Sequence, residues 1–277
     1  MTTAPAPEEG QAALWNGVAG QAWVDAQGVL DHMFRPLEQH LADIVAASPG
    51  RVLDVGCGTG ATTCAFARQG APCLGVDISA PMIAVARERA QREGLAVEFA
   101  CADAQAHPFE PSRFDWIVSR FGVMFFDDPV QAFAKLHRAA RHDGRLCLVA
   151  WRGATDNPFM TTAERAAAPL LPQLPPRRSG APGQFAFAEP GPVLRILEDS
   201  GWRDVDIRPL DVACRFPERD LLLYLSRLGP VGRVLQKMDE PTRNKVIATI
   251  RAAFEPYVHA DTVRFDAACW KISGRAA

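Results

Sequence analysis

The segment Arg51–Thr63, RVLDVGCGTGATT, most constrains how this chain can fold. An apolar stretch typical of a buried strand is followed by glycines at alternate positions, Gly56, Gly58 and Gly60, and then by a helical pattern. Glycines at such a junction let the backbone turn sharply, and a ligand can approach main-chain atoms without meeting a Cβ. In an open parallel sheet, ligands bind at this kind of strand-to-helix turn. The segment therefore predicts a ligand-binding α/β domain.

Short apolar runs alternate with helical patterns from Arg51 to Trp151, which predicts repeated βα units and a mostly parallel, doubly wound sheet. Asp128 and Pro129 supply an N-cap and a first-turn proline for one of these helices. The expected strands are Arg51–Val55, Cys73–Asp77, Ala96–Ala100, Phe114–Ser119 and Arg145–Trp151, and the expected helices are Gly60–Arg68, Ala80–Glu93 and Pro129–Arg141.

Further elements flank this core. Apolar spacing over Gln21–Ala47 predicts helices before the sheet, kinked or broken at Pro36 because proline removes a helix hydrogen-bond donor. The stretch Pro169–Pro192 is too rich in proline and glycine for a helix or a central strand, so we expect a loop or lid. The remaining chain predicts a helix at Gly191–Ser200, a strand at Asp204–Pro209, helical patterns at Pro217–Leu228 and Pro241–Phe254, and a last strand at Val263–Ile272.

Composition excludes several classes of protein. Lys and Arg number 30 against 32 Asp and Glu, so the chain lacks the basic excess typical of nucleic-acid binding. The first ten residues, MTTAPAPEEG, contain no apolar signal region, and no apolar run is long enough to span a membrane. The 7 cysteines are scattered and never spaced C-x-x-C, so we expect no disulfide framework, no metal site and a reducing, cytoplasmic location.

Three acids follow the glycine-rich strand and its two neighbours. Asp54 comes at the end of the first strand, Asp77 at the end of the second and Asp103 just after the third. Because the carboxyl ends of parallel strands share one edge of a sheet, we expect all three side chains to face one crevice. Carboxylates there would repel the pyrophosphate of a dinucleotide. They complement S-adenosylmethionine, which carries two positive groups, two ribose hydroxyls and an adenine amino group.

On this interpretation Asp77 accepts from both ribose hydroxyls, Asp103 accepts from the adenine amino group, and Asp54 orders the turn and favours a cation. Asp also serves simply to cap helices and turns, so the acids alone leave that reading open. Gly56–Ala61 moreover fits the dinucleotide pattern G-x-G-x-x-A, with Asp77 about 20 residues further on. An NAD(P)-dependent oxidoreductase therefore stays an alternative, as does a protein that binds S-adenosylmethionine without turnover.

Beyond the turn itself, the sequence resembles the class I S-adenosylmethionine-dependent methyltransferases, and within them the ubiquinone/menaquinone C-methyltransferase-like group. The resemblance rests on motifs in the expected order: VLDVGCGTG at 52–60, GVDISAPMIAVAR at 75–87, ADA at 102–104, FDWIVSRFGVMFFDDP at 114–129 and LHRAARHDGRL at 136–146. It implies a Rossmann-like methyltransferase fold with a seven-stranded sheet, and a reversed strand at its far edge that Val263–Ile272 would supply.

The resemblance also implies where the cofactor lies. The turn Gly56–Gly60 would contact its methionine part, Ser119, Arg120 and Phe121 would lie beside cofactor and acceptor, and Trp15–Val24 looks like a segment that folds over the cofactor. We therefore predict an N-terminal helical cap at 1–48, a cofactor-binding core at 49–151, a lid insertion at 152–188, and the rest of the sheet domain at 189–277 with a helical insertion at 211–262. The predicted cofactor contacts are Asp54, Gly56, Cys57, Gly58, Gly60, Asp77, Ile78, Asp103, Ala104, Ser119, Arg120, Trp15 and Trp23.

The expected reaction is in-line methyl transfer to a small organic acceptor in an enclosed pocket, where positioning can supply much of the rate. We name no catalytic base, although His32 and His107 could each reach the crevice. Other side chains could build the pocket or simply pack in the core. They are Met33 and Phe34 before the sheet and Phe185 and Phe187 in the lid, while Arg177 and Arg178 form a local basic pair there.

Overall fold

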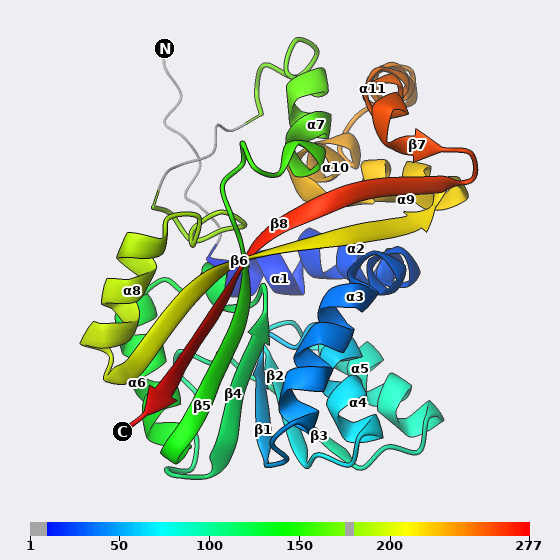
Figure 1. The fold of residues 1–277 in the computed structure, drawn as a ribbon. Coiled ribbons are helices and arrows are strands. Elements are labelled where there is room, and N and C mark those ends of the chain that lie inside the picture. The colour runs from blue at the N-terminus through cyan, green and yellow to red at the C-terminus, as the bar shows by residue number, and fades with distance from the viewer. Residues whose placement is uncertain (1–9, 175–179) are drawn as a thin grey trace.

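The computed structural model describes residues 10–174 and 180–277 and shows a twisted sheet with helices on both faces (Figure 1). Strands β3, β2, β1, β4, β5, β8 and β6 are neighbours in that order, and the short β7 pairs with β8. The first five are mutually parallel, which confirms the doubly wound, mostly parallel fold. The strands are β1 Val52–Val55, β2 Cys73–Asp77, β3 Val97–Cys101, β4 Phe114–Arg120, β5 Ala140–Trp151, β6 Trp202–Pro217, β7 Val258–His259 and β8 Thr262–Ala276.

Helices α3, α4 and α5 lie on one side of the sheet, and α6 and α8 lie on the other (Figure 1). Because helices cover both faces of such a sheet, its central strands are buried on both sides and rich in apolar residues. All four residues of β1 are buried. The longer helices are α1 Gln11–Asn16, α2 Val18–Asp25, α3 Gln27–Ala46, α4 Ala61–Arg68, α5 Ala80–Arg92, α6 Pro129–Ala139, α7 Pro158–Ala167, α8 Pro190–Asp199, α9 Leu221–Arg227, α10 Gly229–Leu235 and α11 Glu240–Ala253. Short 3-10 turns are η1 Val123–Phe125, η2 Glu218–Asp220 and η3 Glu255–Tyr257. Within the described residues, no helix has the length and apolar character needed to cross a bilayer.

The predicted helix break at Pro36 is wrong. Helix α3 runs through Pro36 without interruption, and the chain breaks earlier, between α2 and α3 at Ala26. The side chains of Met33, Leu37 and Leu41 are fully buried along one stripe of α3. Burial of that stripe against the sheet outweighs the loss of one helix hydrogen bond at proline.

The reversed strand β8 does not lie at the edge of the sheet, as the sequence predicted, but between β5 and β6. Ile272 pairs with Leu148 on one side and with Ile207 on the other, and it is fully buried. The edge is β6, which carries the exposed Arg208 and also Pro209, a residue that edge strands tolerate. The reversed, antiparallel direction of β8 is confirmed.

Strands β6 and β8 are longer than predicted, so the helical insertion spans 218–261 and not 211–262. The extra residues form a two-stranded hairpin out to the pair Pro217 and Thr262. Cys214 and Phe216 are buried on one face of β6, whereas Ala213 and Arg215 are exposed on the other face. This alternation of buried and exposed residues is the two-residue period of a strand.

The hairpin carries the helical insertion and α7, which share an aromatic core. Phe159 of α7 stacks on Phe265 of β8 with ring centroids 3.9 Å apart. It also meets Phe254 at 5.1 Å and Tyr257 at 5.0 Å, edge to face. The two insertions after β5 and β6 therefore pack as one body on the far end of the hairpin.

Candidate active site

The glycine-rich turn between β1 and α4 is left-handed at all three glycines, with φ of +68° at Gly56, +55° at Gly58 and +79° at Gly60. A Cβ on Gly56 would lie 2.5 Å from Gly122 Cα, and one on Gly60 would lie 2.8 Å from Ala86 Cβ. A Cβ on Gly58 would meet nothing closer than the Met82 sulfur at 3.8 Å. Protein packing thus requires two of the glycines, while the side of Gly58 has room for an approaching ligand.

Asp77 ends β2 directly beside this turn. Its Oδ2 accepts from the Gly58 N–H at 2.8 Å, and its Oδ1 accepts from the Ser79 N–H at 2.9 Å. Burial raises the pKa of Asp77, whereas the backbone donors Ser79 and Gly58 oppose that shift. An ionised carboxylate can accept about four hydrogen bonds, so acceptor capacity beyond these backbone donors is left for a ligand.

Asp54 points inward. Only 1% of its surface is exposed, and its Oδ2 accepts from the Thr63 hydroxyl of α4 at 2.6 Å. Its carboxylate therefore faces the first turn of α4, and the expectation that all three acids line one rim does not hold for this one. The reason is its place inside β1, one residue before the strand ends.

Asp103 lies in the loop after β3, which starts where the Ala102 N–H donates to the Asp77 carbonyl at 2.8 Å. Asp103 Oδ1 accepts from the Gln105 N–H at 2.9 Å. The Gln105 side chain in turn accepts from the N–H groups of Asp127 and Asp128. Asp103 is half-buried, and the neighbouring Ala104 is buried. The structure thus brings Asp77 and Asp103 to one edge of the sheet.

The N-terminal helices are held at the same edge by Asn16, a residue that is absent from the predicted site. Its Nδ2 donates to the Ile78 carbonyl at 3.0 Å, and its Oδ1 accepts from the Ala80 N–H at 2.9 Å. The Ser79 hydroxyl donates to the Trp15 carbonyl at 2.6 Å. Because these partners are more than 60 residues away in the chain, no local pattern marks Asn16.

Two of the predicted aromatic contacts lie on this N-terminal segment. The Trp15 ring meets Trp23 edge to face at 6.0 Å and Phe125 at 5.1 Å. Phe125 belongs to the turn after β4, so the segment reaches across from the β2 end to the β4 end of the edge. Trp15 and Trp23 are therefore placed over the side of the sheet that holds Asp77.

Ser119 and Arg120 at the end of β4 turn toward the protein. The Ser119 hydroxyl is fully buried, donates to the Val55 carbonyl at 2.7 Å and accepts from the Gly122 N–H at 3.1 Å. Arg120 Nε donates to the Thr62 hydroxyl at 3.1 Å. Cys57 in the glycine turn is likewise buried. These side chains hold neighbouring elements together, and cofactor contacts through them remain a prediction.

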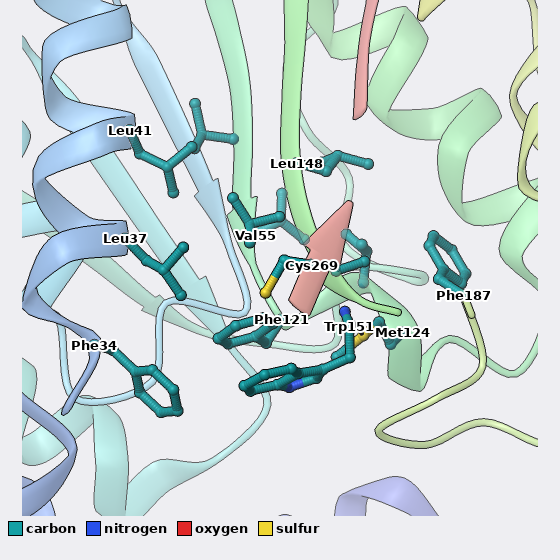
Figure 2. Packing of buried hydrophobic residues seen from close by; sticks show 14 of the residues in the cluster. Phe34, Leu37, Leu41, Val55, Phe121, Met124, Leu148, Trp151, Phe187 and Cys269 are labelled. Atoms are coloured by element: carbon teal, nitrogen blue, oxygen red, sulfur yellow. Dashed lines mark hydrogen bonds between the residues drawn. The ribbon is translucent and has the colours of Figure 1, made fainter. Parts of the chain in front are cut away.

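Apolar side chains gather at the carboxyl ends of β4 and β5, as Figure 2 shows. Phe121 stacks on Trp151 with centroids 4.5 Å apart, and Phe34 of α3 meets Phe121 at 5.3 Å. Phe121 has φ of +68°, a conformation that bulky residues rarely adopt and that concentrates at functional sites. Met124, whose sulfur lies 3.5 Å from the Trp151 backbone N, completes this cluster, which we call the aromatic platform: Phe34, Phe121, Met124 and Trp151. The predicted Phe187 is also buried but lies apart, with its ring 6.2 Å from that of Phe133 in α6.

The remaining candidates lie apart from these contacts. Met33 is fully buried in the core. His32 is exposed, with Nδ1 2.7 Å from the Gly28 carbonyl of its own helix, and the His107 ring packs on Phe109 at 4.7 Å. Phe185 packs against the core, and Arg177 and Arg178 lie outside the described residues. Across residues 10–174 and 180–277, no three His, Cys, Asp or Glu side chains gather as metal ligands would.

Comparison with known proteins decides the family. Residues 53–148 match the family described as a methyltransferase domain. The chain is 30% identical to the nocamycin O-methyltransferase of Saccharothrix syringae over 242 residues, 81% of this chain and 84% of that protein. This chain belongs to the class I S-adenosylmethionine-dependent methyltransferases. The demethylmenaquinone methyltransferase of Renibacterium salmoninarum, 28% identical over 72% of this chain and 86% of its own, supports the menaquinone/ubiquinone C-methyltransferase-like group.

The cofactor of this methyltransferase is S-adenosylmethionine, and its acceptor is a small molecule. The YcgJ protein of Bacillus subtilis has the same fold, with a TM-score of 0.55, 18% identity, and coverage of 86% of this chain and 98% of that one. Membership of the methyltransferase family overturns the oxidoreductase alternative: the G-x-G-x-x-A match arises because both families turn a strand into a helix through glycines.

The affinity of the methyltransferase for its cofactor should depend on pH through Asp54. Burial raises the pKa of Asp54 to about 6, against the Thr63 hydrogen bond and the charge of Arg120. Protonation below that pH would remove a negative charge from beside the glycine turn, where we expect the cationic S-adenosylmethionine to bind, so its dissociation constant should rise as pH falls from 7 to 5. Isothermal titration across this range measures the effect.

The Asp54→Asn variant separates this effect from that of Asp77, whose pKa burial also raises. The variant can still accept from Thr63 but carries no charge, so its affinity at pH 7 should be lower and its pH dependence shallower. Identical pH profiles for the two proteins would show that Asp54 does not act on the cofactor.

Proposed function

We propose that this methyltransferase binds its cofactor along the edge formed by the glycine turn, Asp77 and Asp103, and methylates an organic acceptor held against the aromatic platform. The observation that carries the proposal is the hydrogen bond from the Gly58 N–H to the Asp77 carboxylate, because Gly58 is the one glycine of the turn with room beside it for a ligand. Asp77 would accept from the ribose hydroxyls and Asp103 from the adenine amino group, flanked by Ile78 and Ala104.

The methionine end would lie at the glycine turn and the first turn of α4. N–H groups at the start of a helix lack partners inside it, so they suit a carboxylate. Trp15 and Trp23 would cover the cofactor from the N-terminal segment, and aromatic faces attract a sulfonium as they attract other cations. Asn16 would keep that segment in place through Ile78 and Ala80.

When bound, S-adenosylmethionine supplies an electrophilic methyl group on a good leaving group. The chain's contribution is then to align the acceptor atom in line with the carbon–sulfur bond and to exclude water. The aromatic platform consists of buried or nearly buried apolar side chains, which suits an apolar, planar part of an acceptor. We assign no catalytic base, because neither His32 nor His107 is placed by its contacts at the platform.

We propose the same division of the chain as the sequence predicts, except that both bounds of the second insertion change. A helical cap at 1–48 covers the cofactor, the core at 49–151 binds it, and the insertions at 152–188 and 218–261 enclose the acceptor. The shared aromatic core around Phe159 supports a joint role of the insertions. A cytoplasmic location remains a prediction, in line with 7 cysteines that are all free thiols. The exclusion of nucleic-acid substrates also remains a prediction, and it rests on the net charge of -2.

Two measurements test the proposal. Isothermal titration with S-adenosylhomocysteine should show binding, and the absence of heat at millimolar ligand with folded protein would contradict it. Release of S-adenosylhomocysteine should then be followed over a panel of phenol, hydroquinone, amine and thiol acceptors. Turnover confined to planar apolar acceptors is the expected result, whereas turnover confined to charged or aliphatic acceptors would contradict the platform's role. Binding with no product over the whole panel would instead match the alternative of a protein without turnover.

A further inference from the structure

Two ionisable side chains of the sheet form hydrogen bonds with the first turn of α4. Asp54, on β1, accepts from the Thr63 hydroxyl at 2.6 Å, and Arg120, at the end of β4, donates to the Thr62 hydroxyl at 3.1 Å. Thr62 and Thr63 are consecutive, and only 2% and 0% of their surfaces are exposed. One helical turn is therefore tied to two neighbouring strands by hydrogen bonds from opposite charges.

This turn has no cap of its own. Its N-cap residue is Gly60, in a left-handed conformation and without a side chain to accept from the helix N–H groups. The first N–H groups of α4 therefore have no side-chain acceptor and can bind a ligand. The direction of the helix is instead fixed by hydrogen bonds between its side chains and strands β1 and β4. The two threonines supply those bonds.

An arginine at position 120 is not what stability of the fold alone would favour. Its guanidinium lies 5.2 Å from the Phe34 ring centroid, and none of the described carboxylates forms an ion pair with it within 4.0 Å. Burial lowers the pKa of Arg120, while Glu38 and Asp54 oppose this from a distance. An apolar side chain of similar volume is often at least as stabilising in such a place. The arginine therefore serves a task for which charge and a fixed donor are needed.

We propose that Arg120 is a positioning residue that acts on cofactor binding through Thr62, and that it does not touch the cofactor. Together with Asp54 and Thr63 it sets the direction of the α4 N-terminus at the methionine end of the site. The inference rests on the proposed cofactor site. Arg120 also keeps a positive charge near Asp54, so that the acid stays ionised while it holds Thr63.

A double-mutant cycle tests the route through Thr62. Arg120→Met and Thr62→Val should each weaken S-adenosylhomocysteine binding about tenfold, and the double variant should bind no more weakly than either. Thr62→Ser keeps the hydroxyl and should restore the affinity. Arg208→Met, at an arginine whose side chain is 70% exposed on the edge strand, is the matched control and should bind like the parent chain. Near-parental binding by Thr62→Val beside a large loss in Arg120→Met would show direct contact and overturn the proposal.

The pH profile gives a second readout that a purely structural role would not move. Asp54 faces Thr63 of α4, Arg120 of β4 and, more distantly, Asp77 of β2; Arg120 also faces Glu38 and Asp31 of α3 and Arg89 of α5. Without the arginine charge Asp54 should take up its proton at a higher pH, so the fall in affinity for the cationic S-adenosylmethionine should begin at higher pH in Arg120→Met but not in Thr62→Val. An unchanged profile in Arg120→Met would overturn the link to Asp54.

Circular dichroism melts establish that each variant is folded. If Arg120→Met does not fold, Arg120→Lys and Thr62→Val carry the test: the lysine keeps the charge but not the planar donor, so it should lose affinity and keep the parental pH profile. Parental affinity in both variants would overturn the proposal. Failure of the parent chain itself to bind S-adenosylhomocysteine would instead contradict the proposed function, so the two failures are distinguishable.

Discussion

Replacing Asp77 by alanine should weaken the binding of S-adenosylmethionine by about 1.5–3 kcal/mol, or roughly ten- to more than a hundredfold. The substitution removes the proposed acceptor for the ribose hydroxyls. It also removes the partner of the Gly58 and Ser79 N–H groups, which fix the glycine turn against the β2 end. Isothermal titration with the cofactor and with S-adenosylhomocysteine measures the change.

Asp77→Asn separates these two contributions. The asparagine has one oxygen in place of two, so it can hold one backbone N–H but offers fewer acceptors to the ribose. We expect an intermediate affinity for the cofactor. For S-adenosylmethionine fragments that lack the ribose hydroxyls, such as free methionine, the variant should lose less affinity than it does for the whole cofactor. An affinity for the cofactor that Asp77→Ala leaves unchanged would remove this residue from the site.

Gly56→Ala should destabilise the whole protein by about 2–5 kcal/mol, since it combines backbone strain with overpacking. Gly56 has φ of +68°, and its new Cβ would lie 2.5 Å from Gly122 Cα, where only backbone atoms could move aside. For a chain of this length the melting temperature should fall by roughly 5–15 °C. Thermal melts followed by circular dichroism check this.

Gly58→Ala is the matched comparison, because Gly58 has a similar left-handed backbone conformation but, unlike Gly56, has room for a Cβ. Its φ is +55°, and the nearest atom to a new Cβ is the Met82 sulfur at 3.8 Å. We therefore expect a small loss of stability, about 1–2 kcal/mol from the left-handed backbone alone. Cofactor affinity should fall strongly if the ligand occupies that space. Equal loss of stability in the two variants would contradict the packing argument.

Local signals predicted the sheet and the glycine turn well. The predicted bounds of β2, Cys73–Asp77, are exact. Such strands are easy to predict because they are continuous apolar runs, typical of a parallel sheet covered on both faces, with turn residues on either side. The β6–β8 hairpin was predicted too short because part of it faces solvent. There Val212, Cys214 and Phe216 alternate with Asp211, Ala213 and Arg215, and this alternation is a weaker signal of a strand than a continuous apolar run.

The candidate site was predictable as far as the chain brings residues together by strand order. Asp77 and Asp103 fall at one edge because their strands β2 and β3 are neighbours, as the order of strands and helices in the sequence predicts. Asp54 could not be placed this way, because the choice between rim and interior depends on Thr63 of the next helix. Asn16 and Arg120 depend on tertiary contacts with Ile78 and Thr62, which leave no periodic trace in the sequence.

The pairing of Pro217 with Thr262 brings the two ends of the 44 residues between them to adjacent positions at the tip of the β6–β8 hairpin. Because its two ends lie side by side, such a segment can be exchanged for one of different length without changing the order of the sheet, provided that the replacement keeps the packing of Phe254 and Tyr257 on Phe159. Transplanting residues 218–261 between related chains should therefore redirect acceptor choice while the cofactor machinery is inherited intact.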